Sequence, residues 1–312
     1  MTTTLTNQQL LKRFEKEGQT YYSKNSMVNY LVDVYHFIAY LEERSILTQT
    51  TTDISNYLQH LATLKNEEGN PTYKQSTLNR NRASLVAFYN FIKSEGLLDH
   101  NPVTDLKSVT IHRRGEDTNI DYLNKQEMRQ LLEEIKDEKY LKKDMFSPYN
   151  HARDLVLYHL MLTTGIRMNE VATLTFDQVD RKNHLIHVID KDGQQRTIPY
   201  PTSLDEEMDE YLEIREDLGL ESSLFFITKK GTPISIQNSN AALKKYGDAI
   251  SLGRKISNGV LRHTYAVNMF KIGVPLEEIS TYLGNKSAYY TSILYQEFLS
   301  PTPHTYAEQI DL

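Results

Sequence analysis

The chain has 312 residues, of which 39% are hydrophobic and 24% are charged, so it is long enough for two domains with cores of their own and is not expected to be disordered. It has no run of 18 apolar residues, and its first ten residues are polar, which predicts neither a transmembrane helix nor a signal peptide. Cysteine is absent, which excludes disulfides and thiolate zinc sites and fits a cytoplasmic location.

The formal net charge of −6, taken alone, argues against a protein that binds nucleic acid. Residues 1–110 hold equal numbers of acidic and basic side chains, so the excess acid lies in the remainder. Net charge is a weak test, because DNA responds to the charge on one face of a protein and not to the total. Two interpretations stay open: a protein that never meets DNA, and one with a basic inner face and an acidic outer surface.

The first hundred residues have the pattern of helices. Apolar residues recur at three- and four-residue spacing over 26–43, which predicts one buried stripe made by Val28, Leu31, Val34, Tyr35, Ile38 and Leu41. Thr52 or Asp53 is expected to cap a helix that continues to Leu64. A further helix is predicted over 75–95, with core positions at Leu78, Leu85, Phe88, Tyr89 and Ile92.

Residues 106–120 are predicted to be a linker between two domains. They lack helical or strand periodicity and include the polar run from His112 to Asp117. A helical domain would then occupy residues 1–105, and a second domain would occupy residues 121–312 and end in a polar tail from Ser300. The alternative is an ordinary surface loop inside one domain.

The second domain is predicted to combine helices with a small antiparallel sheet. Asn124 and Glu127 have the spacing of a capping box for a helix that ends near Lys136. Strands over 184–189 and 196–200 are expected to form a hairpin, because Asp-Gly lies between two β-rich runs. A third short strand is expected over 224–227, and further helices over 153–163, 168–174, 204–218, 235–250, 259–272, 275–283 and 288–297.

Three short motifs occur in chain order in the second predicted domain. The first is Gly165-Ile166-Arg167-Met168-Asn169-Glu170-Val171-Ala172-Thr173-Leu174, the second is Val260-Leu261-Arg262-His263-Thr264-Tyr265-Ala266, and the third is Leu283-Gly284 followed by Tyr295. They resemble the three motifs of the tyrosine recombinase (phage integrase) family, of which the first is Gly-Leu-Arg-x-x-Glu-x-x-x-Leu. One motif is weak evidence, but three in order, with Lys191 in a hairpin between the first two, are specific.

The resemblance covers nearly the whole chain and implies both fold and domain roles. Residues 5–102 look like the helical, SAM-like core-binding domain of the family, which binds DNA, and residues 122–298 look like its catalytic domain. The implied fold is therefore mainly α with a small antiparallel β-sheet, namely a helical domain followed by a mixed α+β catalytic domain.

The implied activity is that of a site-specific DNA recombinase, which cleaves and rejoins DNA through a 3′-phosphotyrosine intermediate. Tyr295 would be the nucleophile. Arg167 and Arg262 would hold the non-bridging oxygens of the scissile phosphate through charge-assisted hydrogen bonds. Lys191 would be the general acid for the departing 5′-hydroxyl, and Glu170 would support the arginines. Outside these motifs, such side chains are usually ordinary surface or core residues.

The chain departs from the family pattern at the position of the usual proton acceptor. Gly259 stands where the family most often has a histidine, three residues before Arg262. His263 is a candidate substitute, but helix geometry turns it about 100° away from Arg262, which favours a structural role. Water or the phosphate itself would otherwise take the tyrosine proton.

Two further positions also differ from the family. Asn285 follows the third motif where the family has histidine or tryptophan, and its amide can still donate a hydrogen bond to a phosphate oxygen. Lys191 lies between Asp190 and Asp192 and not between two glycines. Acids close to a lysine raise its pKa and make it a poorer acid.

The resemblance also implies the partners. These are duplex DNA with an inverted-repeat site and further copies of the chain, as a dimer on each site and a tetramer in the synapse; no metal, cofactor or membrane is implied. Because no additional N-terminal arm-binding domain is seen, the chain resembles the Xer-like two-domain members more than lambda-type integrases. The alternatives are a catalytically impaired DNA-binding member of the fold and a type IB topoisomerase-like enzyme.

Overall fold

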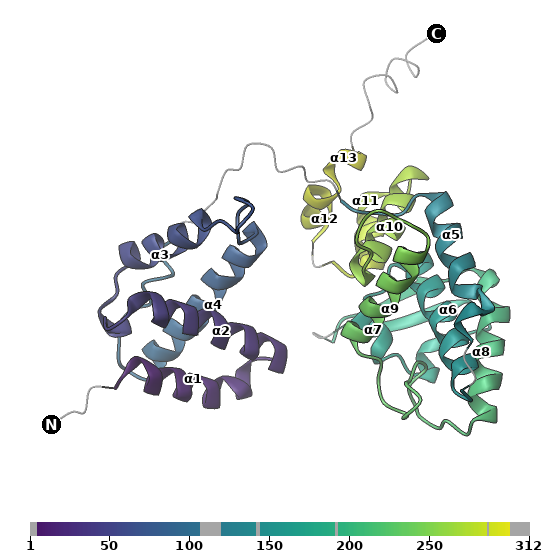
Figure 1. Cartoon of the computed structure of the whole chain (residues 1–312), viewed down its shortest axis with the longest axis horizontal. Coiled ribbons are helices and arrows are strands. Elements are labelled where there is room, and N and C mark those ends of the chain that lie inside the picture. Colours follow the sequence, from purple (N-terminus) through teal and green to yellow (C-terminus); the bar gives the residue numbers. More distant parts are fainter. Residues whose placement is uncertain (1–4, 107–119, 142–143, 191–192, 286, 300–312) are drawn as a thin grey trace, which may run out of the picture. The chain divides into compact units, whose positions relative to one another are not determined.

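The computed structural model describes residues 5–106, 120–141, 144–190, 193–285 and 287–299. The chain divides into two compact units, residues 1–116 and 117–312 (Figure 1), and each has a hydrophobic core of its own. Lys191, the tail from Ser300 and residues 107–119 of the predicted linker lie outside the described residues. None of the described helices combines the length and the apolar character needed to cross a membrane.

The first unit consists of packed helices: α1 (Asn7–Tyr21), α2 (Lys24–Leu41), α3 (Thr51–Thr63) and α4 (Gln75–Ser94). The sequence patterns did not indicate α1, whereas α4 matches its predicted range and buries all of its predicted core residues. The cap of α3 was predicted wrongly, because Thr50 is the N-cap. The Thr50 hydroxyl accepts from the Asp53 amide, and the Asp53 carboxylate accepts from the Thr50 amide.

The buried face of α2 is rotated from the predicted stripe. Val28 and Tyr35 are 54% and 55% exposed, whereas Met27 and Phe37 are buried. The reason is that α2 packs against both α1 and α4, so its buried arc is set by two neighbours and not by the spacing of apolar residues alone.

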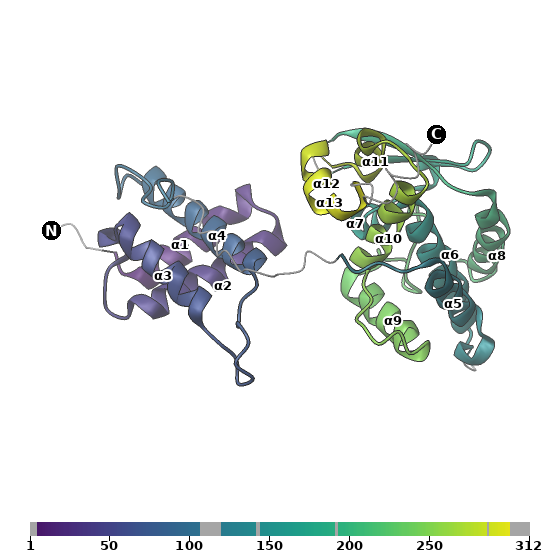
Figure 2. The same ribbon diagram turned by 90° about the horizontal axis from the view of Figure 1, so that it is seen from above.

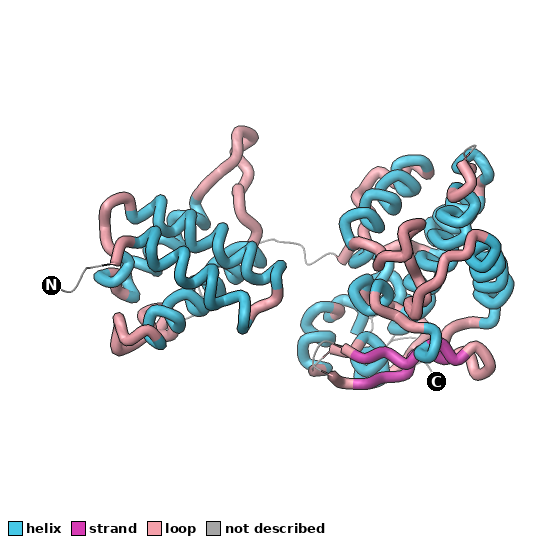
Figure 3. The backbone as a smooth tube through the Cα atoms, turned by 90° about the horizontal axis from the view of Figure 1, so that it is seen from below, coloured by secondary structure: helices cyan, strands magenta, loops and turns pink. Residues whose placement is uncertain are grey.

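The elements of the second unit are α5 (Lys125–Lys136), α6 (Ser147–Thr164), α7 (Met168–Ala172), β1 (Val179–Asp180), β2 (Leu185–Ile189), β3 (Gln195–Pro199), α8 (Asp205–Asp217), α9 (Ile236–Ala249), α10 (Asn258–Lys271), α11 (Leu276–Leu283), α12 (Ala288–Leu294) and α13 (Gln296–Leu299). Helix α6 lies in the interior, in contact with α5, α8 and α10 (Figure 2). The strands, magenta in Figure 3, form a small antiparallel sheet, and their order is β1-β2-β3. The predicted mainly-α fold with a small antiparallel sheet is therefore confirmed.

The strand predicted over 224–227 is wrong. Leu224 and Ile227 make only isolated bridges, to Thr175 and Pro233, and the third strand of the sheet is β1. Phe225 and Phe226 between them are buried, so this apolar run is a core segment that has no partner strand along its length. The capping box of Asn124 and Glu127, by contrast, is confirmed at the start of α5.

Candidate active site

A glycine turn at the end of α6 sets the position of the first arginine. Gly165 has φ 63°, and a Cβ there would lie 2.4 Å from Cδ1 of Tyr265, so both backbone conformation and space require glycine. The chain then turns, and Arg167 becomes the N-cap residue of α7. The Gly165 carbonyl accepts a hydrogen bond of 2.7 Å from Nη1 of Arg262 on α10, so this turn orients both predicted arginines.

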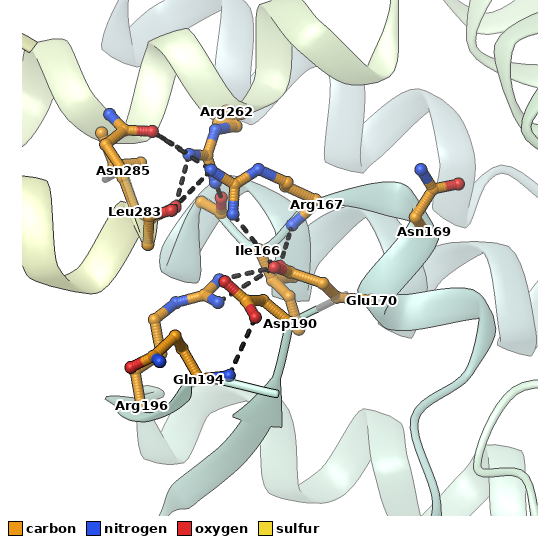
Figure 4. Close-up of polar contacts among 12 residues, drawn as sticks. Ile166, Arg167, Asn169, Glu170, Asp190, Gln194, Arg196, Arg262, Leu283 and Asn285 are labelled. Carbon is orange, nitrogen blue, oxygen red and sulfur yellow. Dashed lines mark hydrogen bonds and ion pairs between the residues drawn. The ribbon is translucent and has the colours of Figure 1, made fainter. Parts of the chain in front are cut away.

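The two predicted arginines converge on one side-chain oxygen. Nη2 of Arg167 and Nη2 of Arg262 each lie 3.1 Å from Oδ1 of Asn285 (Figure 4). The same Nη2 atoms donate to backbone carbonyls at the end of α11, Arg167 to Gly284 at 2.8 Å and Arg262 to Leu283 at 2.5 Å. The motifs that are far apart in sequence therefore meet at this point.

The paired arginines form a concentrated positive charge. Burial and the neighbouring Arg167 lower the pKa of Arg262 to about 10, which still leaves Arg262 charged at neutral pH. Asn285 contributes no compensating charge. Its amide nitrogen donates to Oγ1 of Thr291 at 2.9 Å, so the oxygen and not the predicted nitrogen of this amide faces the arginines.

Arg196 on β3 is a part of this cluster that the sequence patterns did not single out. Its Nη1 and Nη2 atoms pair with Oε1 and Oε2 of Glu170 at 2.9 and 2.7 Å, and Glu170 also binds Nη1 of Arg167 at 3.0 Å. Burial raises the pKa of Glu170, but Arg196 and Arg167 outweigh it and hold that pKa below its usual value. The alternation of inward and outward residues along a strand could have identified Arg196 from the sequence, because Arg196 lies on the same inward face of β3 as Ile198.

Gly284 allows Arg196 to reach this position. Its φ is 60°, and a Cβ on it would lie 2.7 Å from Nη1 of Arg196, so the guanidinium covers the glycine backbone directly. Nε of Arg196 donates to the Tyr282 carbonyl at 2.8 Å. Arg196 and Glu170 thus join β3, α7 and the end of α11 around Arg167.

Tyr295, the predicted nucleophile, interrupts the helix that was predicted over 288–297. It caps α12 with φ −111° and ψ 25°, and α13 starts at the next residue. Its side chain is only 1% exposed and packs against the ring of Phe270, with centroids 5.4 Å apart. Burial raises the pKa of Tyr295 to about 12, although Arg262 opposes this, so the phenol is protonated at neutral pH.

His263 contacts the hydroxyl of that tyrosine. Nδ1 of His263 lies 2.8 Å from the Tyr295 hydroxyl. The sequence pattern favoured a structural role for His263 and did not predict this contact. Burial, followed by the neighbouring Arg262, lowers the pKa of His263. Gly259 is exposed, and the nearest atom to a Cβ there would be Oγ of Ser257 at 3.6 Å, so this position is open but provides no side chain.

A cavity of about 490 Å³ adjoins the arginine cluster. It lies between the β2–β3 hairpin and the end of α11, and its lining includes Asp190, Arg196 and Asn285. Asp190 accepts a hydrogen bond from the Gln194 amide at 2.9 Å, which shapes the described part of the hairpin turn. Within the described ranges, no cluster of three or more histidine, aspartate and glutamate side chains is arranged to hold a metal ion.

Comparisons with known proteins agree with the three motifs. The model of the phage integrase family matches residues 121–298, and that of the phage integrase N-terminal SAM-like domain matches residues 11–96. Similar proteins include tyrosine recombinase XerC of Listeria welshimeri, 25% identical over 92% of this chain and 91% of the relative. XerC of Thermodesulfovibrio yellowstonii is 28% identical over 70% of each chain.

Solved structures share the fold. The XerH site-specific recombinase bound to difH substrate, in a pre-cleavage complex, matches 99% of this chain and 84% of its own with a TM-score of 0.72 and 18% identity. The Tn1549 transposon integrase in complex with circular intermediate DNA matches 99% of this chain and 100% of its own, with a TM-score of 0.64 and 16% identity.

Proposed function

The chain belongs to the phage integrase family, and we propose from this membership that it is a site-specific DNA recombinase that works through a covalent phosphotyrosine bond. The observation that carries the proposal is the convergence of Arg167 and Arg262 on a single oxygen. Burial raises the pKa of the Tyr295 phenol, and the nearby Arg262 partly opposes this. Two fixed cations, one of them close to a phenol, are groups that phosphoryl transfer to tyrosine needs.

The arginines are proposed to bind the scissile phosphate where Asn285 now presents its oxygen. An amide oxygen between two guanidiniums stands in for a non-bridging phosphate oxygen, which carries more negative charge and binds more strongly. The carbonyls of Gly165, Leu283 and Gly284 already fix both guanidiniums. Each preorganised donor of this kind accelerates the reaction by a factor on the order of 10²–10³.

In the proposed reaction, the oxygen of Tyr295 bonds to phosphorus while the bond from phosphorus to the 5′-oxygen breaks. The departing oxygen requires a proton, and the family resemblance assigns that role to Lys191. The product is a 3′-phosphotyrosine and a free 5′-hydroxyl. Attack by a 5′-hydroxyl reverses the step and releases the tyrosine, so rejoining requires no external energy source.

The proposed partner is duplex DNA with an inverted-repeat site, bound by a dimer on each site and a tetramer in the synapse. Each half-site would provide one scissile phosphate to one Tyr295. Similar folds have been solved with DNA, including the XerH and Tn1549 complexes, which supports the class of partner. The cytoplasm is the proposed location.

The test is trapping of the covalent intermediate. Binding sites are first selected from randomised duplex DNA with the full-length protein, and the selected sites are then nicked beside candidate cleavage positions so that the released fragment diffuses away. We expect a protein–DNA adduct from the wild type and none from Tyr295→Phe, at equal DNA binding, on a denaturing gel.

Other outcomes separate the alternatives. Specific binding without an adduct on any selected site would indicate a non-catalytic DNA-binding member of the fold. Efficient relaxation of supercoiled DNA that lacks the selected site would indicate a type IB topoisomerase-like activity.

A further inference from the structure

We propose that His263 accepts the proton of Tyr295 during DNA cleavage, in place of the histidine that the chain lacks at Gly259. This inference rests on the proposed recombinase function. It assigns a catalytic role to a residue for which the sequence pattern favoured a structural one, and it explains how a chain with glycine at position 259 can still activate its tyrosine.

The geometry places the base within hydrogen-bond distance of the reacting oxygen. Nδ1 of His263 lies 2.8 Å from the Tyr295 hydroxyl, which is within the reach required for direct proton transfer. When the ring carries its hydrogen on Nε2, Nδ1 offers a lone pair to the hydroxyl. The 100° turn between His263 and Arg262 on α10 lets the two side chains divide the work, because Arg262 faces Asn285 and His263 faces Tyr295.

The same helix also fixes the tyrosine ring. Phe270, also on α10, packs against Tyr295 with ring centroids 5.4 Å apart, and the His263 ring lies 5.8 Å from it at an interplanar angle of 63°. Tyr295 ends α12, and both contacts come from α10, so the two rings hold the nucleophile against the helix that carries the base. This is the preorganisation that efficient proton transfer requires.

The electrostatic environment fits the role. Tyr295 is buried with a pKa of about 12, so at neutral pH it requires an acceptor for its proton. The charged groups facing His263 are Arg262 on its own helix and Asp121 before α5; burial and Arg262 lower the pKa of His263, and Asp121 opposes them. His263 is therefore neutral at neutral pH and has its lone pair available.

The proton and electron balance is complete. The phenol O–H bond breaks as the bond from oxygen to phosphorus forms, and the proton passes to Nδ1 of His263 to give an imidazolium. Because the bond to phosphorus consumes the developing phenolate, a separated pair of ions does not have to accumulate. In rejoining, the imidazolium returns the proton to the leaving phenolate.

The test is single-turnover cleavage of a nicked site by the full-length protein across a range of pH. His263→Asn is the informative variant, because the amide oxygen of asparagine takes the place of Nδ1 and accepts a hydrogen bond but is not a base. We expect cleavage to fall by about 10²–10⁴ with DNA affinity and melting temperature retained. The wild-type rate should rise with pH up to a pKa below 6.5 and then level off, and this rise should be absent in His263→Asn.

The matched control is His187→Asn on β2, an exposed histidine, which should leave rate and pH profile unchanged. Addition of imidazole should restore cleavage in His263→Ala but not in Tyr295→Phe. If wild type forms the adduct and His263→Asn cleaves equally fast with the same pH profile, the assignment of His263 is wrong and the recombinase proposal stands. If wild type forms no adduct on any site, the recombinase proposal itself fails.

Discussion

At the scale of single residues, the pairing of Glu170 with Arg196 is the contact on which the arginine cluster depends. Both side chains are nearly inaccessible, 8% and 7% exposed, so removal of Arg196 takes two charge-assisted hydrogen bonds from the buried Glu170 and leaves it the pairing with Arg167. The exposed pair of Lys244 and Asp248, 64% and 63% exposed, has the same chemistry without the burial. Buried and exposed ion pairs should therefore respond very differently to loss of the cation.

We predict that Arg196→Met lowers the free energy of unfolding by about 3–5 kcal/mol, because Glu170 loses its bidentate partner. Lys244→Met should change it by less than about 1 kcal/mol. Urea unfolding of both variants measures the difference. Equal effects in the two variants would show that Glu170 is satisfied by Arg167 alone.

The limits of the sequence are clearest at these residues. Arg167, Glu170, Arg262 and Tyr295 could be selected because short motifs mark them, and their roles remain predictions. The pairing of Arg196 with Glu170 spans 26 residues, and the contact of His263 with Tyr295 spans 32. Local periodicity carries no information about which distant side chains meet.

At the scale of secondary-structure elements, the turn between α11 and α12 links the arginine cluster to the tyrosine. Asn285 after α11 donates to Thr291 on α12, and Thr291 donates to Ser280 on α11 at 3.1 Å. Tyr295 then ends α12. A shift in this buried network is therefore transmitted to the nucleophile through one short helix.

We predict that Thr291→Val lowers the cleavage rate by up to about 10²-fold, the effect of a displacement near 1 Å, and leaves DNA affinity unchanged. The substitution keeps the volume of the side chain but removes the hydroxyl that Asn285 needs. Single-turnover adduct formation measures the effect. Thr281→Val is the control, because that exposed hydroxyl only donates to the Glu277 carbonyl within α11; similar losses in both variants would refute the proposed link.

Elements could be predicted where a helix or hairpin has its own local signal. The capping box of α5 and the Asp-Gly hairpin are such cases, because cap and turn residues specify them. The run from Leu224 to Ile227 was misread as a strand because burial in a core and pairing in a sheet favour the same apolar residues. The break at Tyr295 has no glycine or proline to mark it and depends on tertiary packing against α10.

At the scale of the whole molecule, the chain forms two compact units, residues 1–116 and 117–312, and each has its own core. The cluster of catalytic candidates lies entirely in the second unit, whereas the family resemblance assigns DNA binding to both. The second unit would thus carry the catalytic residues, and the first unit would contribute much of the affinity for DNA.

We predict that residues 117–312 fold alone but form far less adduct than the full chain at physiological salt, because phosphate contacts from the first unit are lost. Lower salt should restore part of the adduct yield, because contacts between the protein and the DNA phosphates strengthen as the salt concentration falls. Circular dichroism reports folding and gel analysis reports the adduct. Full activity of the fragment at every salt concentration would contradict a DNA-binding role for the first unit.

The two guanidiniums that share one amide oxygen have a consequence for heat resistance. Burial lowers the pKa of Arg262 and repulsion from Arg167 lowers it further, whereas Glu170 opposes both, and the neutral amide relieves little of the repulsion. An incoming phosphodiester anion neutralises this repulsion, so the native state gains free energy that the unfolded chain does not. Occupied by its substrate, the protein should thus tolerate a higher temperature than it does alone.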